Sequence, residues 1–336
     1  MGKYILKRIG MGLLVLLGVV TITFFISRVL PSSPEMKWAG QRATPEQLEA
    51  ARIELGLDKP LYIQYVNYLK QLLHGDLGVS LTSKKPVTQE LGEYIPATLE
   101  LVILTFLLSM IISVPLGVYS AKKKDRLLDH FGRLFSIGAV SLPTFWVALF
   151  LQLIFYKALN LFPLGGQMSI SALMLVDRPN VTGFLLLDCL LTGNTALFWD
   201  ALKHYILPCV TLMTYPVGVI SRMTRSAMLE ILNEDYIQAG RSYGLSETKI
   251  LWKYATKNSL GTMASNITMC FGSTLMNTFL IEAIFSWPGV GNYISSSVTS
   301  LDFPAIIGVT IFGAVCYTIL NLIADITVAL DPRVRL

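Results

Sequence analysis

The chain has 336 residues, of which 53% are hydrophobic and 15% are charged, and its mean hydropathy is +0.57. A typical globular chain carries about 25% charged residues, so this composition argues against a soluble protein and excludes a disordered chain, a collagen and a disulfide-rich secreted domain. The net charge of +5 would indicate nucleic-acid binding only if the basic residues clustered on a polar domain; they do not, and no nucleic-acid partner is expected.

Six stretches are long and apolar enough to cross a membrane, since a helix needs about 20 apolar residues to span the roughly 30 Å hydrocarbon core. The first follows Lys7 and Arg8 like a signal peptide, but it has no A-x-A site after it and favours an uncleaved anchor. The sequence predicts an all-α membrane protein with six transmembrane helices. These helices are expected over residues 9–29, 97–120, 134–157, 204–220, 264–285 and 305–330.

Residues 30–96 are too patterned for a linker and predict a small external helical domain. Thr44 and Gln47 form a capping box with Pro45 at the first helical position, and Gly56 is placed to end that helix. A second helix is expected from Pro60 to Gly75. The domain is a cap on the membrane part, a docking surface for an external partner, or both. In a later external segment, the apolar run 184–191 is too short to span and is expected at the membrane interface.

The stretch 221–263 contains two short helical patterns separated by Gly244. Before this glycine lie small and apolar residues at helical spacing, among them Tyr236 and Ala239, and after it Ser246 is a good N-cap. Glu247 then suits the positive start of the next helix. Gly244 is expected to supply a positive φ between the two helices. The result is a helix–Gly–helix hairpin that projects as a compact knob.

The distribution of basic residues predicts the orientation. Loop 121–133 holds five Lys or Arg residues, whereas loop 286–303 holds none. Because cytoplasmic loops carry an excess of Lys and Arg, both termini and the knob are expected in the cytoplasm.

Seven short strings in the chain resemble those of a known family. The string DYIQAGRSYGLSE, from Asp235, resembles the EAA loop of permease subunits from binding-protein-dependent ABC importers, and the likeness is closest to the peptide/nickel branch. One departure is the lack of a proline in residues 257–262, where Gly261 is a candidate for a comparable break. Six further strings match that branch in order: LGLDKPL from Leu55, GDLGVS from Gly75, PATLEL from Pro96, SLPTFW from Ser141, IFSWPGVG from Ile284 and DPRVRL from Asp331.

The resemblance implies a transmembrane permease of the bacterial inner membrane that forms half of a pathway for di- and oligopeptides. It divides the chain into the first span (1–29), the external domain (30–96), a five-helix core (97–330) with coupling loop 225–260, and a tail (331–336). The implied partners are a second homologous permease, two ATP-binding subunits, an external solute-binding protein and membrane lipids. The residues implied in coupling to the ATPase are Glu234, Asp235, Tyr236, Ala239, Gly240, Gly244, Ser246 and Glu247.

No GxxxxGK[ST] phosphate loop occurs in the chain. No enzymatic activity or cofactor is therefore expected here, and ATP and Mg²⁺ are expected on the partner ATPase subunits. The four cysteines are far apart, without a CxxC pair or nearby histidine, so they are interpreted as small buried hydrophobic residues and no metal site is expected.

Polar residues of the fifth span are candidates for the pathway, because polar groups are costly in lipid and should face the bundle interior. The pattern is equally compatible with polar residues that line a pathway and with polar residues that form hydrogen bonds between helices. The alternatives for the whole chain are a permease for nickel, a metallophore, glutathione or haem, and, in another class, a self-sufficient secondary transporter or channel. The candidate pathway or gate residues are Asn266, Thr268, Ser273, Asn277, Thr278 and Glu282.

Overall fold

The computed structural model describes residues 2–29, 33–40, 42–175 and 178–329, and among them it contains helices and loops but no β-strand. The expected all-α fold is confirmed. Five helices are long and apolar enough to cross a membrane. They are α1 (Gly2–Val29), α5 (Val87–Lys122), α10 (Thr195–Ile231), α13 (Lys257–Ile284) and α15 (Phe303–Ala329).

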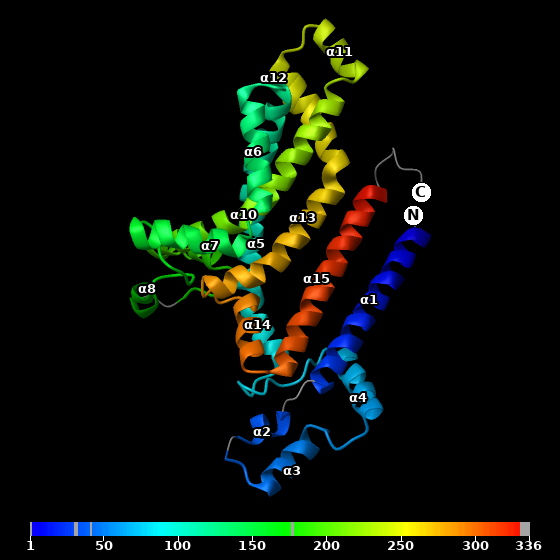
Figure 1. The fold of residues 1–336 in the computed structure, drawn as a ribbon, viewed down its shortest axis with the longest axis vertical. Helices are drawn as coiled ribbons and strands as arrows, with labels where there is room; N and C mark the ends of the chain where they lie inside the picture. The colour runs from blue at the N-terminus through cyan, green and yellow to red at the C-terminus, as the bar shows by residue number, and fades with distance from the viewer. Residues whose placement is uncertain (1, 30–32, 41, 176–177, 330–336) are drawn as a thin grey trace.

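The third expected span is broken rather than straight. Residues 134–157 belong to α6 (Leu127–Ser141) and α7 (Thr144–Leu151), and the second helix continues as a π-helical segment, Gln152–Ala158. The two parts are bent by 100°, and α7 points sideways from the bundle (Figure 1). Leu142 is extended, with φ −83° and ψ 131°, because Pro143 disfavours a helical residue before it. The prediction of one continuous helix is wrong, and six spans are reached only if this pair counts as one.

The centre of the molecule is the crossing of α5 and α10. A Cβ atom at Gly117 would lie 2.7 Å from the carbonyl oxygen of Ser221 and 2.5 Å from Cβ of Thr224, so only glycine permits this approach. Pro208 and Pro216 lie inside α10 without ending it. The long pair provides the frame on which α6, α7 and α13 pack, whereas α1 packs on α15.

The two ends of the molecule carry different structures. Helices α2 (Pro34–Ala39), α3 (Pro45–Glu54) and α4 (Leu61–Leu73) lie at one end, and α11 (Asp235–Ser242) lies at the other (Figure 1). The capping box at the start of α3 is formed as predicted: Thr44 accepts from the backbone of Gln47, whose side chain accepts from the backbone of Thr44.

Helix α4 packs on the end of α1 through its tyrosines. The Tyr65 ring lies 5.3 Å from the Phe24 ring, and Tyr68 stacks on the same ring at 5.5 Å. The leucines at the two ends of α4, Leu61 and Leu73, are 53% and 86% exposed. The small domain is thus fixed to α1 by aromatic contacts.

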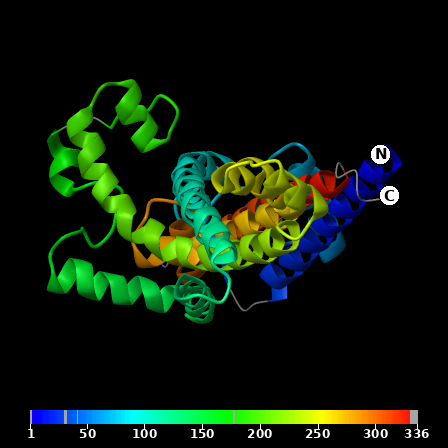
Figure 2. The ribbon, with the colours of Figure 1, turned by 90° about the horizontal axis from the view of Figure 1, so that it is seen from above.

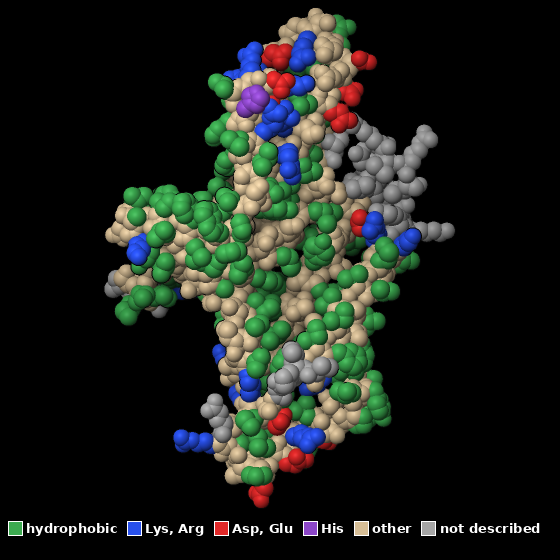
Figure 3. Space-filling model, viewed as in Figure 1, with side chains coloured by type: hydrophobic (Ala, Val, Ile, Leu, Met, Phe, Trp, Pro, Cys, Tyr) green, Lys and Arg blue, Asp and Glu red, His purple; other side chains and the backbone are tan. Residues whose placement is uncertain are grey.

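The surface has a hydrophobic middle and charged ends. Figure 3 shows green side chains across the centre of this face, with Lys, Arg, Asp and Glu concentrated around α11 and around α2–α4. Leu13 and Leu14 on α1 are 62% and 72% exposed, as expected for a lipid-facing helix. Seen down the long axis, α1 and α15 lie side by side at one edge, and α7, α8 (Ile170–Leu175) and α9 (Leu185–Leu191) extend at the other (Figure 2).

Candidate functional site: the helix–glycine–helix knob and the helices that carry it

The knob consists of α11, the turn at Gly244 and α12 (Glu247–Lys249). Helix α11 begins at Asp235 and has Arg241 in its last turn, so the charge at each end suits the helix dipole. Gly244 has φ +75°, as expected. Its N–H donates to the carbonyl of Arg241 at 2.9 Å, and Leu245 N–H donates to Gly240 at 3.1 Å. This pair of bonds is a Schellman motif, which closes the helix with a left-handed residue.

Two contacts hold the knob against the helix that follows it, and a third joins the two sides of its turn. Ile237 is 1% exposed and packs in an apolar cluster with the segment that follows the turn. Asn258 Nδ2 donates to the hydroxyl of Tyr236 at 2.9 Å. Arg241 Nε donates to Glu247 Oε1 at 2.9 Å across the turn. The knob therefore has one buried apolar anchor and two polar ties, so it is a firmly seated structure rather than a loose loop.

The face of the knob that points away from the bundle is open. Gly240 is half-buried, and the other residues expected in coupling are exposed. Sequence reasoning missed Tyr243, which is 87% exposed; a large aromatic ring inside a polar loop was the available signal. The residues of the open face are Glu234, Asp235, Ala239, Tyr243, Gly244 and Ser246; Tyr236 and Glu247 are also exposed, but each accepts one of the hydrogen bonds described above.

The chain runs from the knob into α13 without a break at Gly261. Helix α12 passes into a π-helical segment, Ile250–Thr256, and α13 then continues to Ile284. Thr256 Oγ1 donates to the carbonyl of Leu251, five residues earlier, at 2.8 Å. The expected break at Gly261 is wrong, since the helix tolerates an interior glycine and the irregularity comes earlier. The knob and α13 thus form one lever.

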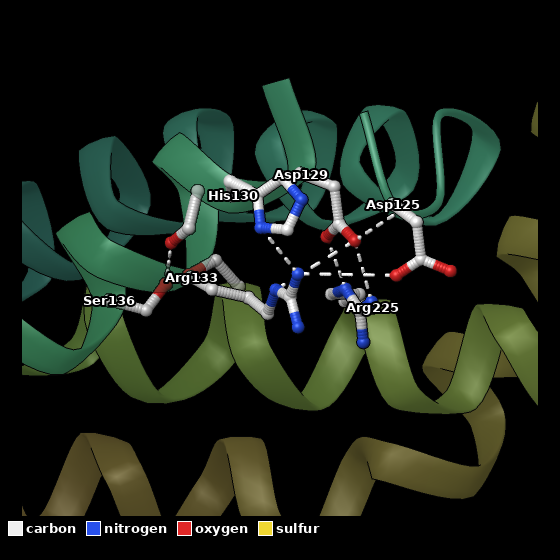
Figure 4. Close-up of polar contacts among 8 residues, drawn as sticks. Asp125, Asp129, His130, Arg133, Ser136 and Arg225 are labelled. Atoms are coloured by element: carbon white, nitrogen blue, oxygen red, sulfur yellow. Dashed lines mark hydrogen bonds and ion pairs between the residues drawn. The ribbon is translucent and has the colours of Figure 1, made fainter. Parts of the chain in front are cut away.

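A buried ion pair ties α6 to α10 close to the knob, and we call it the Asp129–Arg225 clamp (Figure 4). The Asp129 side chain is 0% exposed and the Arg225 side chain 19%. Arg225 donates through Nε and Nη2, the latter at 2.8 Å from Oδ2. The backbone N–H of Asp125 donates to the same carboxylate at 3.0 Å. The clamp lies on α10 shortly before the knob, so it fixes α6 to the helix that leads into the knob.

Sequence reasoning missed this clamp because it weighed loop 121–133 only by its basic residues. Two acids inside a basic loop were the available signal. A second polar contact, with 2.8 Å between Oγ of Ser136 and Oγ of Ser221, joins the same two helices. Arg133 donates through Nη2 to His130 Nδ1 at 2.7 Å and stays 3.8 Å from Asp129.

The six candidate pathway residues are three on one face of α13, two threonines bonded to their own helix, and Glu282. Asn266, Ser273 and Asn277 share one face of α13, because they are seven and four residues apart; the two asparagines are exposed and Ser273 is half-buried. Thr268 and Thr278 donate to carbonyls of their own helix, at 3.0 and 2.8 Å.

Glu282, the sixth candidate, is buried and supports a short helix. It is 0% exposed, and its Oε2 accepts the backbone N–H of Gly291 at 2.6 Å, in the first turn of α14 (Val290–Thr299). A carboxylate at a helix N-terminus satisfies N–H groups that lack a partner. Glu282 therefore holds the loop after α13 in place.

Glu100 supports α9 in the same way and was missed by sequence reasoning. Its two carboxylate oxygens accept the backbone N–H groups of Leu185 and Leu186 at 2.8 Å each, and it also accepts the Tyr205 hydroxyl. The predicted span began at residue 97, which made Glu100 look terminal, whereas α5 begins at Val87. An acid inside a membrane helix is a signal for a functional or structural role.

The short run 184–191 forms α9, which has one buried side and one exposed apolar side, with Leu190 and Leu191 60% and 61% exposed. Leu185 and Asp188 are both 0% exposed. The Asp188 carboxylate accepts the backbone N–H groups of residues 181–183 and the Thr182 hydroxyl at 2.6 Å. Burial alone would raise the pKa of Asp188, but these hydrogen bonds hold its pKa below the usual value.

The buried cysteines belong to the apolar clusters of the core, and Cys270 shares a cluster with Ile237. Cys189, Cys209 and Cys270 are buried, Cys316 is half-buried, and all four are free thiols. Within the described ranges, no three His, Cys, Asp or Glu side chains are grouped as metal ligands would be.

Comparison with known proteins identifies the family. A model described as binding-protein-dependent transport system inner membrane component matches residues 113–336, and a model for the N-terminal part of such membrane components matches residues 1–102. The probable D,D-dipeptide transport system permease protein of Escherichia coli strain K12 is 42% identical over 323 residues, which cover 96% of this chain and 94% of that protein.

Two further relatives cover the chain almost completely. The dipeptide transport system permease protein of Escherichia coli strain K12 is 35% identical over 335 residues, 99% of this chain and 98% of the relative. The di/tripeptide transport system permease protein of Pseudomonas aeruginosa strain UCBPP-PA14 is 36% identical over 335 residues, with the same shares. Together with the apolar spanning helices, these matches show that the chain belongs to the family of binding-protein-dependent transport system inner membrane components.

Proposed function

We propose that this chain is a permease subunit of an ABC importer for dipeptides and short oligopeptides, and that it forms half of the translocation pathway. The relatives named for dipeptide and di/tripeptide transport support this substrate class. Their likeness extends over nearly the whole chain, so it includes the membrane helices as well as the knob.

The observation that carries the proposal is the open face of the knob. It is polar and aromatic and points away from the bundle, while Ile237 packs against the segment after the turn and the Tyr236 hydroxyl is bonded to Asn258 of α13. In this proposal the open face of the knob docks on an ATP-binding subunit, and the complex contains two such subunits. A displacement of that subunit then passes along the continuous helix into α13, which requires a rigid element and two discrete packings of the bundle.

The pathway is proposed to run along the face of α13 that carries Asn266, Ser273 and Asn277. Two of these residues are exposed in this chain, and polar side chains are costly against lipid. A second, homologous permease facing this stripe would enclose a polar route between the two subunits. Glu282 and Thr278, being buried, would support the helix rather than touch the peptide.

The orientation follows from the same proposal. The knob and loop 121–133 lie in the cytoplasm with both termini, and α2–α4 lie outside, where they are available to a solute-binding protein. The two regions are at opposite ends of the molecule (Figure 1), as this arrangement requires.

The test is affinity purification of the chain from its own membranes in a mild detergent, with a photo-crosslinking amino acid at one exposed tyrosine. Tyr243, 87% exposed on the knob, is the test position, and Tyr62, 70% exposed on α4, is the matched control at the other end. We expect an ATP-binding subunit to crosslink to position 243 only, and di- and tripeptides with their binding protein to stimulate ATP hydrolysis.

Other outcomes contradict the proposal in separate ways. If Ni²⁺ or haem stimulated ATP hydrolysis and peptides did not, the proposed substrate would be wrong but the proposed coupling to the ATP-binding subunit would stand. A chain that purifies alone and transports in liposomes without ATP would instead be a self-sufficient transporter.

A further inference from the structure

A cavity of about 330 Å³ lies beside the Asp129–Arg225 clamp, between α5, α6 and α10. Three arginines line it: Arg133 from α6, and Arg222 and Arg225 from α10. The transport proposal gives this cavity no role, because it is neither part of the knob's open face nor on the polar face of α13.

The charges around the cavity do not balance. Asp129 is the one fully buried carboxylate near these arginines, and Arg225 already occupies both of its oxygens. Arg133 is 3.8 Å from Asp129 and 4.0 Å from Asp125, whose side chain is 67% exposed. Arg222 forms no ion pair with any residue that the structure describes. The cavity thus has surplus guanidinium charge.

The surplus charge is accompanied by free hydroxyl groups. Ser120 lines the cavity and is 3% exposed, yet its hydroxyl makes no hydrogen bond to a described residue. Ser226 also lines the cavity, four residues after Arg222. Guanidinium groups with nearby hydroxyls match the oxygens of a phosphate, which arginine binds in a bidentate manner.

An apolar surface begins at the edge of the same cavity. Ile137 lines it and is 56% exposed, and Leu134 and Phe131 on the same helix are 71% and 67% exposed. A free phosphate would leave this surface uncovered, whereas acyl chains would cover it. The ligand that fits is therefore an amphiphile with an anionic phosphodiester.

We propose that this cavity binds the headgroup of an anionic phospholipid, with the phosphodiester on Arg222 and the serine hydroxyls, beside the paired Arg133 and Arg225, and an acyl chain along α6. Basic pockets between membrane helices on the cytoplasmic side are known to hold such headgroups. The leaflet concerned rests on the orientation proposed above, but binding itself does not. A lipid at this position joins α5, α6 and α10 next to the clamp, where α10 leads into the knob.

The test uses the whole complex, purified in neutral detergent after exposure to vesicles of phosphatidylethanolamine and phosphatidylglycerol, with bound lipid identified by native mass spectrometry. Arg222→Gln removes one guanidinium without breaking an ion pair to a described residue. Ser226→Phe places a large side chain at the exposed edge of the cavity without changing charge. Arg126→Gln is the matched control, because it changes the same charge on the same cytoplasmic side at an exposed residue that does not line the cavity.

We expect retained phosphatidylglycerol to fall about tenfold in Arg222→Gln, as for loss of a charged hydrogen bond, to fall in Ser226→Phe, and to stay unchanged in Arg126→Gln. Equal loss in Arg126→Gln would mean nonspecific attraction and would overturn the proposal, as would full retention in Ser226→Phe. If millimolar inorganic phosphate displaced the lipid completely, the site would be one for free phosphate. Crosslinking from position 243 is a separate readout, so a failure of the transport proposal remains distinguishable.

Discussion

Replacing Gly244 should uncouple the knob from transport through backbone conformation alone. A Cβ atom at Gly244 would meet no heavy atom within 4 Å, so a larger side chain has room. Its φ of +75° is what a β-branched residue resists, because the left-handed region crowds its side chain against the backbone. Gly244→Val therefore tests one property of the residue and not its size.

The magnitude follows from the turn. Placing a residue other than glycine in the left-handed region costs about 1–3 kcal/mol, and about 1.4 kcal/mol corresponds to a tenfold change in population. If the turn opens, the bonds from Gly244 and Leu245 to Arg241 and Gly240 are lost, and the tie between Arg241 and Glu247 is weakened. We expect peptide uptake to fall about tenfold or more, with normal insertion, because the knob lies outside the bundle.

The assay compares uptake and peptide-stimulated ATP hydrolysis for three variants at equal abundance. Gly244→Asn should keep most activity, since asparagine tolerates a positive φ. Gly92→Val is a control in α5, where an added Cβ also meets nothing within 4 Å and φ is not positive. Equal loss in Gly244→Asn and Gly244→Val, or wild-type uptake in both, would refute the conformational reasoning.

Three further predictions follow from the buried polar contacts and the pathway face. Asp129→Ala should destabilise the solubilised complex by about 3–5 kcal/mol, because Arg225 keeps a buried charge without its partner; in a thermal-unfolding double-mutant cycle with Arg225→Ala, additive losses would argue against the clamp. Asn277→Leu should lower peptide uptake at unchanged abundance, and wild-type uptake would remove Asn277 from the proposed pathway. Asp188→Asn should lower the unfolding temperature at neutral pH. Because the pKa of Asp188 is lowered in the folded chain, its stabilising effect exists above the unfolded value of about 3.9 and fades as pH falls through the folded value. The difference in unfolding temperature between Asp188→Asn and wild type should therefore shrink in acid, and a difference that does not change with pH would contradict this account.

Local patterns in the sequence were sufficient for much of this structure. Long apolar windows predicted the spanning helices, since span length depends on membrane thickness. The capping box at Thr44 and the positive φ at Gly244 were also predictable, because each depends on residues within one turn. For the same reason the string around Gly244 was sufficient to indicate the family.

Only the tertiary structure decided the contacts between distant segments. The Asp129–Arg225 clamp joins residues 96 positions apart, and Glu100 meets Leu185 across 85. No spacing rule predicts such pairs, because side-chain periodicity describes neighbours on one helix and not the helix packed against it. The direction in which α7 runs after Pro143 and the burial of Glu282 also depend on how the helices pack against each other. What the residues form locally follows from their order, but which acid faces which N–H group or arginine depends on how the helices cross.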